Sequence, residues 1–225
     1  MKKILFLSGL IFIFITCCKK DITSDVLSCN FTNYRYYKDE IKSLGELSGD
    51  YILIGSDTVN SDGVIRDLIK SKGYFDQNYN YKVYKHSGYK YKYFAMKLLR
   101  TYKCNSITWI INDLHQSPIV DFAHYTIQTD DCMNDIWEPM GNLCVKSYSN
   151  SFYVKVKNAD NISDLENIVL QTNTIIKMQD KYMKEWYILN ADKDSQGDAL
   201  KMANYFFETG LFVYSEPDIL TLPVE

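Results

Sequence analysis

The chain has 225 residues, with 25 Lys and Arg against 28 Asp and Glu, which gives a formal net charge of −3. A slightly acidic chain without a basic stripe has nothing to hold a phosphate backbone, so the composition argues against nucleic acid as a partner. The 19 tyrosines suit either half-buried strand positions or a surface that binds a macromolecule.

The N-terminus reads MKKILFLSGLIFIFITCCKK: two lysines, an apolar run from Ile4 to Ile15, and then two cysteines. This layout is typical of an export signal, and the run is short for a membrane span, which needs about 20 apolar residues. The end of the run resembles a bacterial lipobox. It predicts a lipoprotein signal peptide over residues 1–17 and acylation of Cys18, with Cys17 as the alternative.

This N-terminal segment predicts where the protein is located. The alternatives to a lipoprotein signal are a plain secretory signal and an N-terminal anchor helix. We expect an outer-membrane lipoprotein of the cell envelope, facing the periplasm or the cell surface. Acyl chains would tether it to the membrane, because each buried methylene contributes about 0.8 kcal/mol.

Four cysteines follow the lipobox pair: Cys29, Cys104, Cys132 and Cys144. An oxidising compartment permits disulfides, and four cysteines allow three pairings. The favoured pair is Cys132 with Cys144, because both lie in one expected loop region.

The first half begins with a tether and N-terminal segment over residues 18–48. Residues 49–112 form the first expected α+β unit. It opens with a strand around Ile52–Gly55 and a helix that has Val64, Ile65, Leu68 and Ile69 on one face. A strand in YNYKVYKHS, a helix in YFAMKLLRTYK and a strand in SITWII follow. Residues 113–150 are a connecting segment, which is long enough to carry a strand or hairpin of its own.

The second expected unit covers residues 151–225. A strand in FYVKVKN leads to a helix in ISDLENIVLQ, where Ser163 and Glu166 form a capping box, and two strands follow in TIIKMQ and MKEWYILNA. An apolar stripe that includes Phe206 predicts the last helix, and Gly210 suits its left-handed cap. A short strand at Leu211–Tyr214 then leaves a tail.

The order of elements therefore repeats. Laying AMKLLRTYKCNSITWI from Ala95 over ALKMANYFFETGLFVY from Ala199 matches apolar positions and predicts an internal duplication. Each unit reads β-α-β-β-α-β, so the predicted fold is α+β, with two tandem ferredoxin-like units built on antiparallel sheets. Right-handed crossovers place both helices of a unit on one side, which leaves the other face of each sheet open.

The sequence contains no recognisable catalytic or metal-binding motif. Asp113, His115, Asp121 and His124 lie close together, yet no spacing typical of a metal site is present. A Cys132–His124 nucleophile pair is disfavoured because an exported thiol tends to be oxidised. No nucleophile elbow or phosphate-binding glycine loop occurs. We expect a protein that is not an enzyme, with no metal, no cofactor and no small-molecule substrate.

A family resemblance lies in three stretches: YRYYKDEIKSLG, FYVKVKNADNISDLENIV and KYMKEWYILNADKDSQGDALKMANYFFETGLFVYSEPDI. They resemble the N-terminal pro-region of the large subtilisin-like serine proteases of Bacteroides-type bacteria. The resemblance is most specific at Ala203-Asn204, at Glu208–Phe212 and at Glu216-Pro217-Asp218, and it covers residues 34–150 more weakly.

The resemblance implies a partner. Such pro-regions have ferredoxin-like folds, pack an open sheet face on the protease, and place the tail after their last strand in its substrate cleft. On this basis the partner is a subtilisin-like serine protease that is inhibited or helped to fold in trans. The protease-binding tail is Ile219, Leu220, Thr221, Leu222, Pro223 and Val224.

The sequence departs from the family after Glu-Pro-Asp, where a catalytic domain with its Asp, His and Ser motifs is expected and the chain ends at Glu225. Two alternatives therefore stay open: a remnant of a truncated protease, and a surface lipoprotein that binds a glycan or host protein through its tyrosines.

Overall fold

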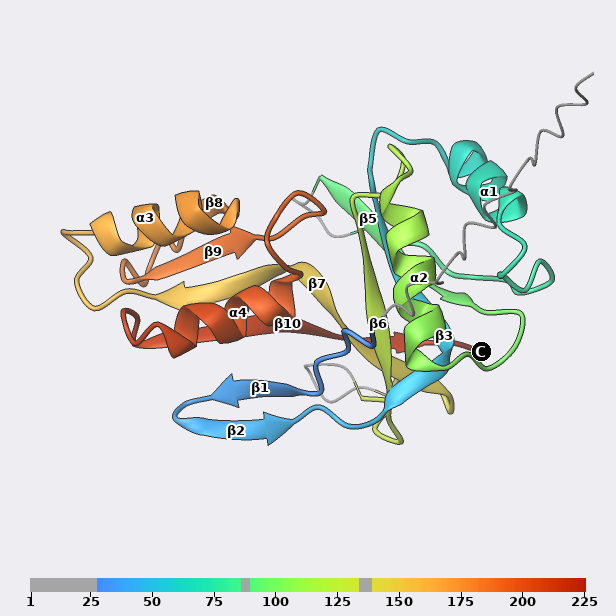
Figure 1. Ribbon diagram of the computed structural model, residues 1–225, viewed down its shortest axis with the longest axis horizontal. Coiled ribbons are helices and arrows are strands. Elements are labelled where there is room, and N and C mark those ends of the chain that lie inside the picture. The colour runs from blue at the N-terminus through green and yellow to red at the C-terminus, as the bar shows by residue number, and fades with distance from the viewer. Residues whose placement is uncertain (1–27, 86–89, 134–138) are drawn as a thin grey trace, which may run out of the picture.

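The computed structural model describes residues 28–85, 90–133 and 139–225. Within these residues the chain forms an α+β fold with four helices and antiparallel strands (Figure 1). The predicted signal peptide, and with it Cys17 and Cys18, lies outside the described residues.

The first half of the chain opens with a hairpin and continues with four further strands and two helices. Its elements are β1 (Tyr34–Tyr37), β2 (Glu40–Ser43), β3 (Leu47–Asp57), α1 (Asp62–Ser71), β4 (Tyr84–Lys85), β5 (Tyr91–Lys97), α2 (Cys104–His115) and β6 (Phe122–Gln128).

The second half repeats the order strand, helix, two strands, helix, strand. Its elements are β7 (Cys144–Lys155), α3 (Ser163–Thr172), β8 (Ile175–Gln179), β9 (Trp186–Asn190), α4 (Ala199–Glu208) and β10 (Tyr214–Pro223).

One antiparallel sheet runs through both halves, in the order β4-β5-β3-β6-β7-β9-β8, and β10 also pairs with β7. In the first half, β3 lies between β5 and β6, with β4 beyond β5. In the second half, β7 lies between β9 and β10, with β8 beyond β9. The two halves therefore share one strand order, and short pairing between β6 and β7 joins them.

Each half has its own core between its helices and its sheet. In the first half, Ile52 and Ile54 of β3 pack with Ile65 of α1 and Ile107 of α2. In the second half, the core includes Phe206 of α4, which is fully buried, as its place in the apolar stripe predicts.

Capping residues explain where α1 and α4 begin and where α4 ends. Ser61 caps α1, and its hydroxyl accepts a hydrogen bond from Val64 N. Asp198 caps α4 by accepting from Lys201 N, and Gly210 takes the positive φ of 69° that its cap role predicts. The expected capping box of α3 is wrong: the N-cap is Ile162 without a side-chain bond, and Ser163 N donates to Asn161 Oδ1 instead.

Two predictions for the first half are wrong, and they are wrong in complementary ways. The stretch expected as a helix, YFAMKLLRTYK, contains most of β5, and SITWII, expected as a strand, lies in α2. β5 is buried on both faces, so its apolar residues are continuous and carry no strand alternation. In α2 the β-branched residues hide a helical spacing of buried positions, Ile107, Ile110, Ile111 and Leu114.

The unit boundaries shift as a result. β6 is the fourth strand of the first half, and it lies in the segment of residues 113–150 that was expected to connect the units. The Ala95 to Ala199 alignment is also wrong, because it lays β5 over α4. The repeat of element order stands, with α2 as the counterpart of α4.

Candidate binding surfaces

The sheet face of the first half that points away from α1 and α2 is covered by the protein itself. Tyr51, Leu53, Tyr93 and Phe122 lie on this face and are all buried. The cover consists of the first part of β7, the last part of β10 and the residue after it, which contribute Val145, Leu220, Leu222 and Val224 to the same apolar cluster. The expectation of an open face is therefore wrong for this half.

Close packing continues along the covered face. Phe122 lies against Gly55, where a Cβ would come within 2.0 Å of the ring, so glycine is required there. Ser147 of β7 donates a hydrogen bond to Tyr125 O at 2.8 Å, and His124 Nδ1 donates to Tyr148 O at 2.8 Å. The cover is an integral layer of the fold.

The predicted protease-binding tail forms part of this cover. Residues 219–223 belong to β10 and pair with β7, from Ile219 opposite Tyr148 to Pro223 opposite Cys144. Leu222 is 1% exposed. The expected strand at Leu211–Tyr214 is wrong as well, because β10 starts at Tyr214 and includes the tail. In Figure 1, β10 runs from beside α4 to the C-terminus, past β6 and β3.

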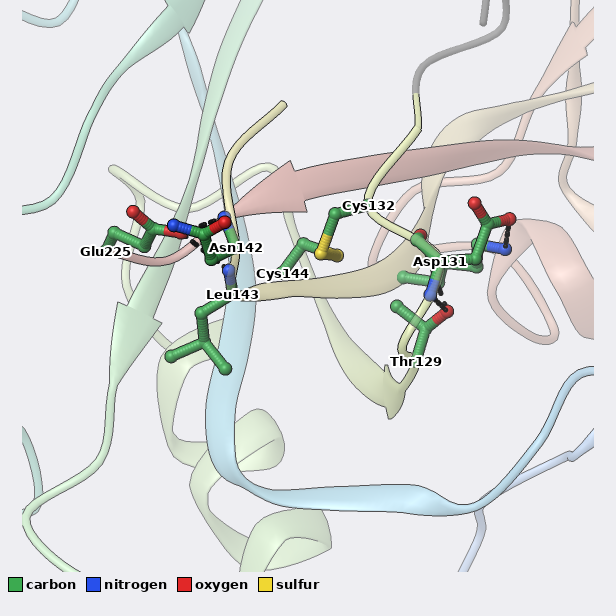
Figure 2. Close-up of a disulfide and its surroundings, with 8 residues drawn as sticks. Thr129, Asp131, Cys132, Asn142, Leu143, Cys144 and Glu225 are labelled. Atoms are coloured by element: carbon green, nitrogen blue, oxygen red, sulfur yellow. Dashed lines mark hydrogen bonds and ion pairs between the residues drawn. A yellow bond between two sulfur atoms is a disulfide. The ribbon is translucent and has the colours of Figure 1, made fainter. Parts of the chain in front are cut away.

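The end of the chain is held by the turn before β7. Figure 2 shows Glu225 pointing toward Asn142 and Leu143, next to the disulfide between Cys132 and Cys144. The Glu225 carboxylate accepts hydrogen bonds from both backbone N–H groups, at 2.6 Å from Leu143 N. Gly141 makes room for it with a φ of 128°. The tail is thus paired with β7, buried at Leu222 and Val224, and held at its end.

Both cysteine pairs form disulfides. The favoured pairing of Cys132 with Cys144 is confirmed, and Cys29 is joined to Cys104 at the start of α2. Two disulfides indicate an extracytoplasmic protein, because reducing compartments keep thiols free. Among the described residues, no helix combines the length and apolar character needed to cross a bilayer.

The corresponding sheet face of the second half is partly exposed. Two rows of side chains cross it: Tyr214, Lys155 and Trp186 in one, and Glu216, Tyr153, Ile188 and Met178 in the next. We call these seven residues the second-half face. Met178 is 52% exposed, and Trp186 and Ile188 are partly exposed.

The β1–β2 hairpin borders the second-half face along β10. Arg35 forms an ion pair with Glu216 at 3.1 Å, and the ring of Tyr37 meets that of Tyr214 edge-on at 6.5 Å. On the other side of the hairpin, Tyr36 stacks on Phe207 of α4. Burial raises the pKa of Glu216, and the Arg35 charge opposes part of that rise.

The four residues considered for a metal site do not form one. Asp113 accepts hydrogen bonds from Lys72 Nζ at 2.6 Å and from the Tyr74 hydroxyl at 2.7 Å. His115 Nε2 accepts from Ala123 N at 3.1 Å. In the part of the chain that the structure describes, no group of three or more His, Cys, Asp or Glu residues has the geometry for a metal ion.

His115 and His124 line a cavity of about 230 Å³ between α2 and the start of α4. Burial lowers the pKa of His115 to about 4, and burial lowers the pKa of His124 as well. Both imidazoles are therefore neutral at pH 7. His115 hydrogen-bonds within the first half, and His124 hydrogen-bonds across to β7 of the second half.

Comparisons with known proteins provide little further guidance. No family model matches the chain, and no curated protein matches it. One similar solved structure is the acetolactate synthase small subunit from Thermotoga maritima, with 11% identity and a TM-score of 0.27, covering 77% of this chain and 95% of that one. A TM-score this low does not establish a shared fold.

Proposed function

We propose that the protein is an exported, lipid-anchored binding protein built from two ferredoxin-like units. In this proposal a subtilisin-like serine protease binds to the second-half face, and the protein inhibits the protease or helps it to fold. The strand order of each half, with the first strand between the third and fourth, supports the ferredoxin-like description. The two disulfides support export.

The observation that carries the proposal is the difference between the two sheet faces. The first-half face is buried under β7 and β10, whereas the second-half face leaves Met178, Trp186 and Ile188 accessible to solvent. Partly exposed aromatic and aliphatic side chains on a rigid sheet are suited to a protein interface, where such residues supply most of the binding energy.

The choice of a protease as partner comes from the resemblance of the sequence to subtilisin pro-regions. One of the three most specific stretches of that resemblance, Glu216-Pro217-Asp218, lies on β10 beside the face, and the ion pair of Glu216 with Arg35 fixes the hairpin at its border. The tail plays no part in this binding mode, because it is already used inside the fold.

The test is capture of serine hydrolases from a cell-envelope extract on the immobilised protein, detected with a fluorophosphonate label that reacts with active serines. Met178→Asp places a charge in the proposed interface and should weaken capture at least about 10-fold. Leu170→Asp is the matched control, because Leu170 is a 79% exposed aliphatic residue on α3, away from the face.

Loss of capture with Met178→Asp and its retention with Leu170→Asp would support the proposal. Equal capture by both variants, or the absence of any labelled hydrolase on the wild-type protein, would exclude it.

A further inference from the structure

A cleft of about 720 Å³ lies where the two halves meet, and it is distinct from the second-half face. The first half contributes Asp121, and the second half contributes Asn150, Ile175 and Asn190. Its volume falls within the range of pockets that bind small molecules, which often form between domains.

Asn150 is the first sign that this cleft binds something. It is 7% exposed and lines the cleft, and its buried side-chain oxygen, Oδ1, has no hydrogen-bond partner among the described residues. Its neighbours are satisfied: Ser149 Oγ donates to Asp218 at 2.7 Å, and Ser151 Oγ donates to Asn190 Oδ1 at 2.9 Å. Because a buried amide without a partner costs free energy, such a group indicates a missing ligand or water.

Asp121 is the second sign, and it comes from the other half. Its backbone N–H donates to Gly55 O at 3.0 Å, whereas within the described residues its carboxyl group has neither a hydrogen bond nor an ion pair. Burial and the neighbouring Asp57 carboxylate raise the pKa of Asp121 to about 6. At neutral pH the Asp121 carboxylate is a poorly solvated hydrogen-bond acceptor, so a hydrogen bond from an O–H donor would stabilise it.

The rest of the lining indicates which chemistry fits. Lysines and aspartates both line the cleft in similar numbers, including Lys193 between Asp192 and Asp194 in the sequence, so neither sign of charge dominates. Ile175, which is 54% exposed, supplies an apolar wall. A hydroxyl group both donates and accepts, so it can pair with carboxylate, ammonium and amide groups alike, while C–H faces contact the isoleucine.

We propose that this cleft binds a neutral, hydroxyl-rich small molecule the size of a mono- or disaccharide, with Asn150 and Asp121 as its hydrogen-bonding residues. The two residues are 29 positions apart in the sequence and approach each other only because both halves contribute to one sheet.

The experiment is ligand-observed NMR and calorimetry with the full chain and a panel of neutral sugars: glucose, galactose, mannose, N-acetylglucosamine and their common disaccharides. Asn150→Leu and Asp121→Asn both keep the approximate side-chain volume. Asn150→Leu removes the proposed hydrogen-bonding group, and Asp121→Asn replaces the charged carboxylate acceptor by a weaker, uncharged amide. We expect each to weaken binding of the sugar that the wild type prefers by at least 10-fold, or about 1.4 kcal/mol. Asp67→Asn, at an exposed position on α1, is the control and should bind like the wild type.

A second measurement separates binding from folding. Asn150→Leu removes a buried amide whose oxygen is unpaired, so its melting temperature should equal or exceed that of the wild type. A clear fall in melting temperature would show that the amide is paired within the protein and would overturn the proposal. So would a wild type that binds no sugar of the panel, or variants that bind as well as it does.

Discussion

The hydroxyl of Tyr51, on the central strand of the first half, donates a hydrogen bond to the carbonyl oxygen of Val224, the second-to-last residue, at 3.5 Å. It joins the start of the first unit to the end of the second, across 173 positions of sequence. The contact lies within the apolar cluster that covers the first-half face. The C-terminal segment is therefore a structural element of the first unit as well as the last strand of the second.

The first prediction concerns this segment. Leu222→Ala should lower the free energy of unfolding by about 2–5 kcal/mol, because the leucine is fully packed between the halves. Urea denaturation followed by circular dichroism measures the change. Thr221→Ala, on the same strand but partly exposed, is the control and should cost much less. A change below about 0.5 kcal/mol for Leu222→Ala would mean that the tail is not packed as described.

The second prediction orders the two disulfides by the length of chain that they close. Cys132 and Cys144 are 12 positions apart, and Cys29 and Cys104 are 75 apart. Loop-closure entropy gives about 3 kcal/mol for the short loop and about 4 kcal/mol for the long one. Replacing each pair by serines and measuring unfolding in urea tests the order. The reverse order would show that loop closure does not determine their effects.

The third prediction follows from the raised pKa of Asp121, which is about 6 in the folded protein against an ordinary value of 3.8. The folded state holds this proton more tightly than the unfolded state, so the group's contribution to stability is present below about pH 4 and is lost as the pH rises through 6. Above pH 6, ionisation of the Asp121 carboxyl therefore destabilises the folded wild type, and Asp121→Asn lacks this destabilisation.

The size of that penalty is about 1–2 kcal/mol, after allowance for partial solvent exposure of the carboxyl. The free energy of unfolding of Asp121→Asn, relative to wild type, should rise by this amount between pH 4 and pH 7.5. Denaturation curves at the two values measure it, and Asp67→Asn provides the baseline. A difference that does not change with pH would mean that Asp121 titrates normally.

Much of the second half could be predicted from local sequence. β8, β9 and α4 carry alternation, helical periodicity and a glycine cap that act within a few residues, and Phe206 is buried as its spacing indicates. In the first half, β5 reads as a helix because it is buried on both faces and lacks strand alternation. α2 reads as a strand because its β-branched residues hide the helical spacing. Local pattern cannot show burial by a distant segment.

The position of the tail depends on a long-range event of the same kind. Nothing in the sequence around Leu222 indicates that it pairs opposite Val145, on the other side of two helices and two strands. Asn150 was missed for a related reason. An asparagine within a strand gives no signal in the sequence, and only the structure shows that its Oδ1 lacks a hydrogen-bond partner while the hydroxyls of Ser149 and Ser151 have one. Asp121 was noticed for its proximity to histidines, but the cleft that it lines is completed by residues of the other half.

The ribbon formed by β7 and β10 determines how many sheet faces the molecule leaves exposed. Two copies of one folding pattern would ordinarily present two equivalent docking surfaces and engage two partners at once. Here the strands of one copy extend over the sheet of the other, so a fold whose order of elements repeats leaves one of its two outward sheet faces exposed. A complex of the proposed kind would therefore have a stoichiometry of one to one.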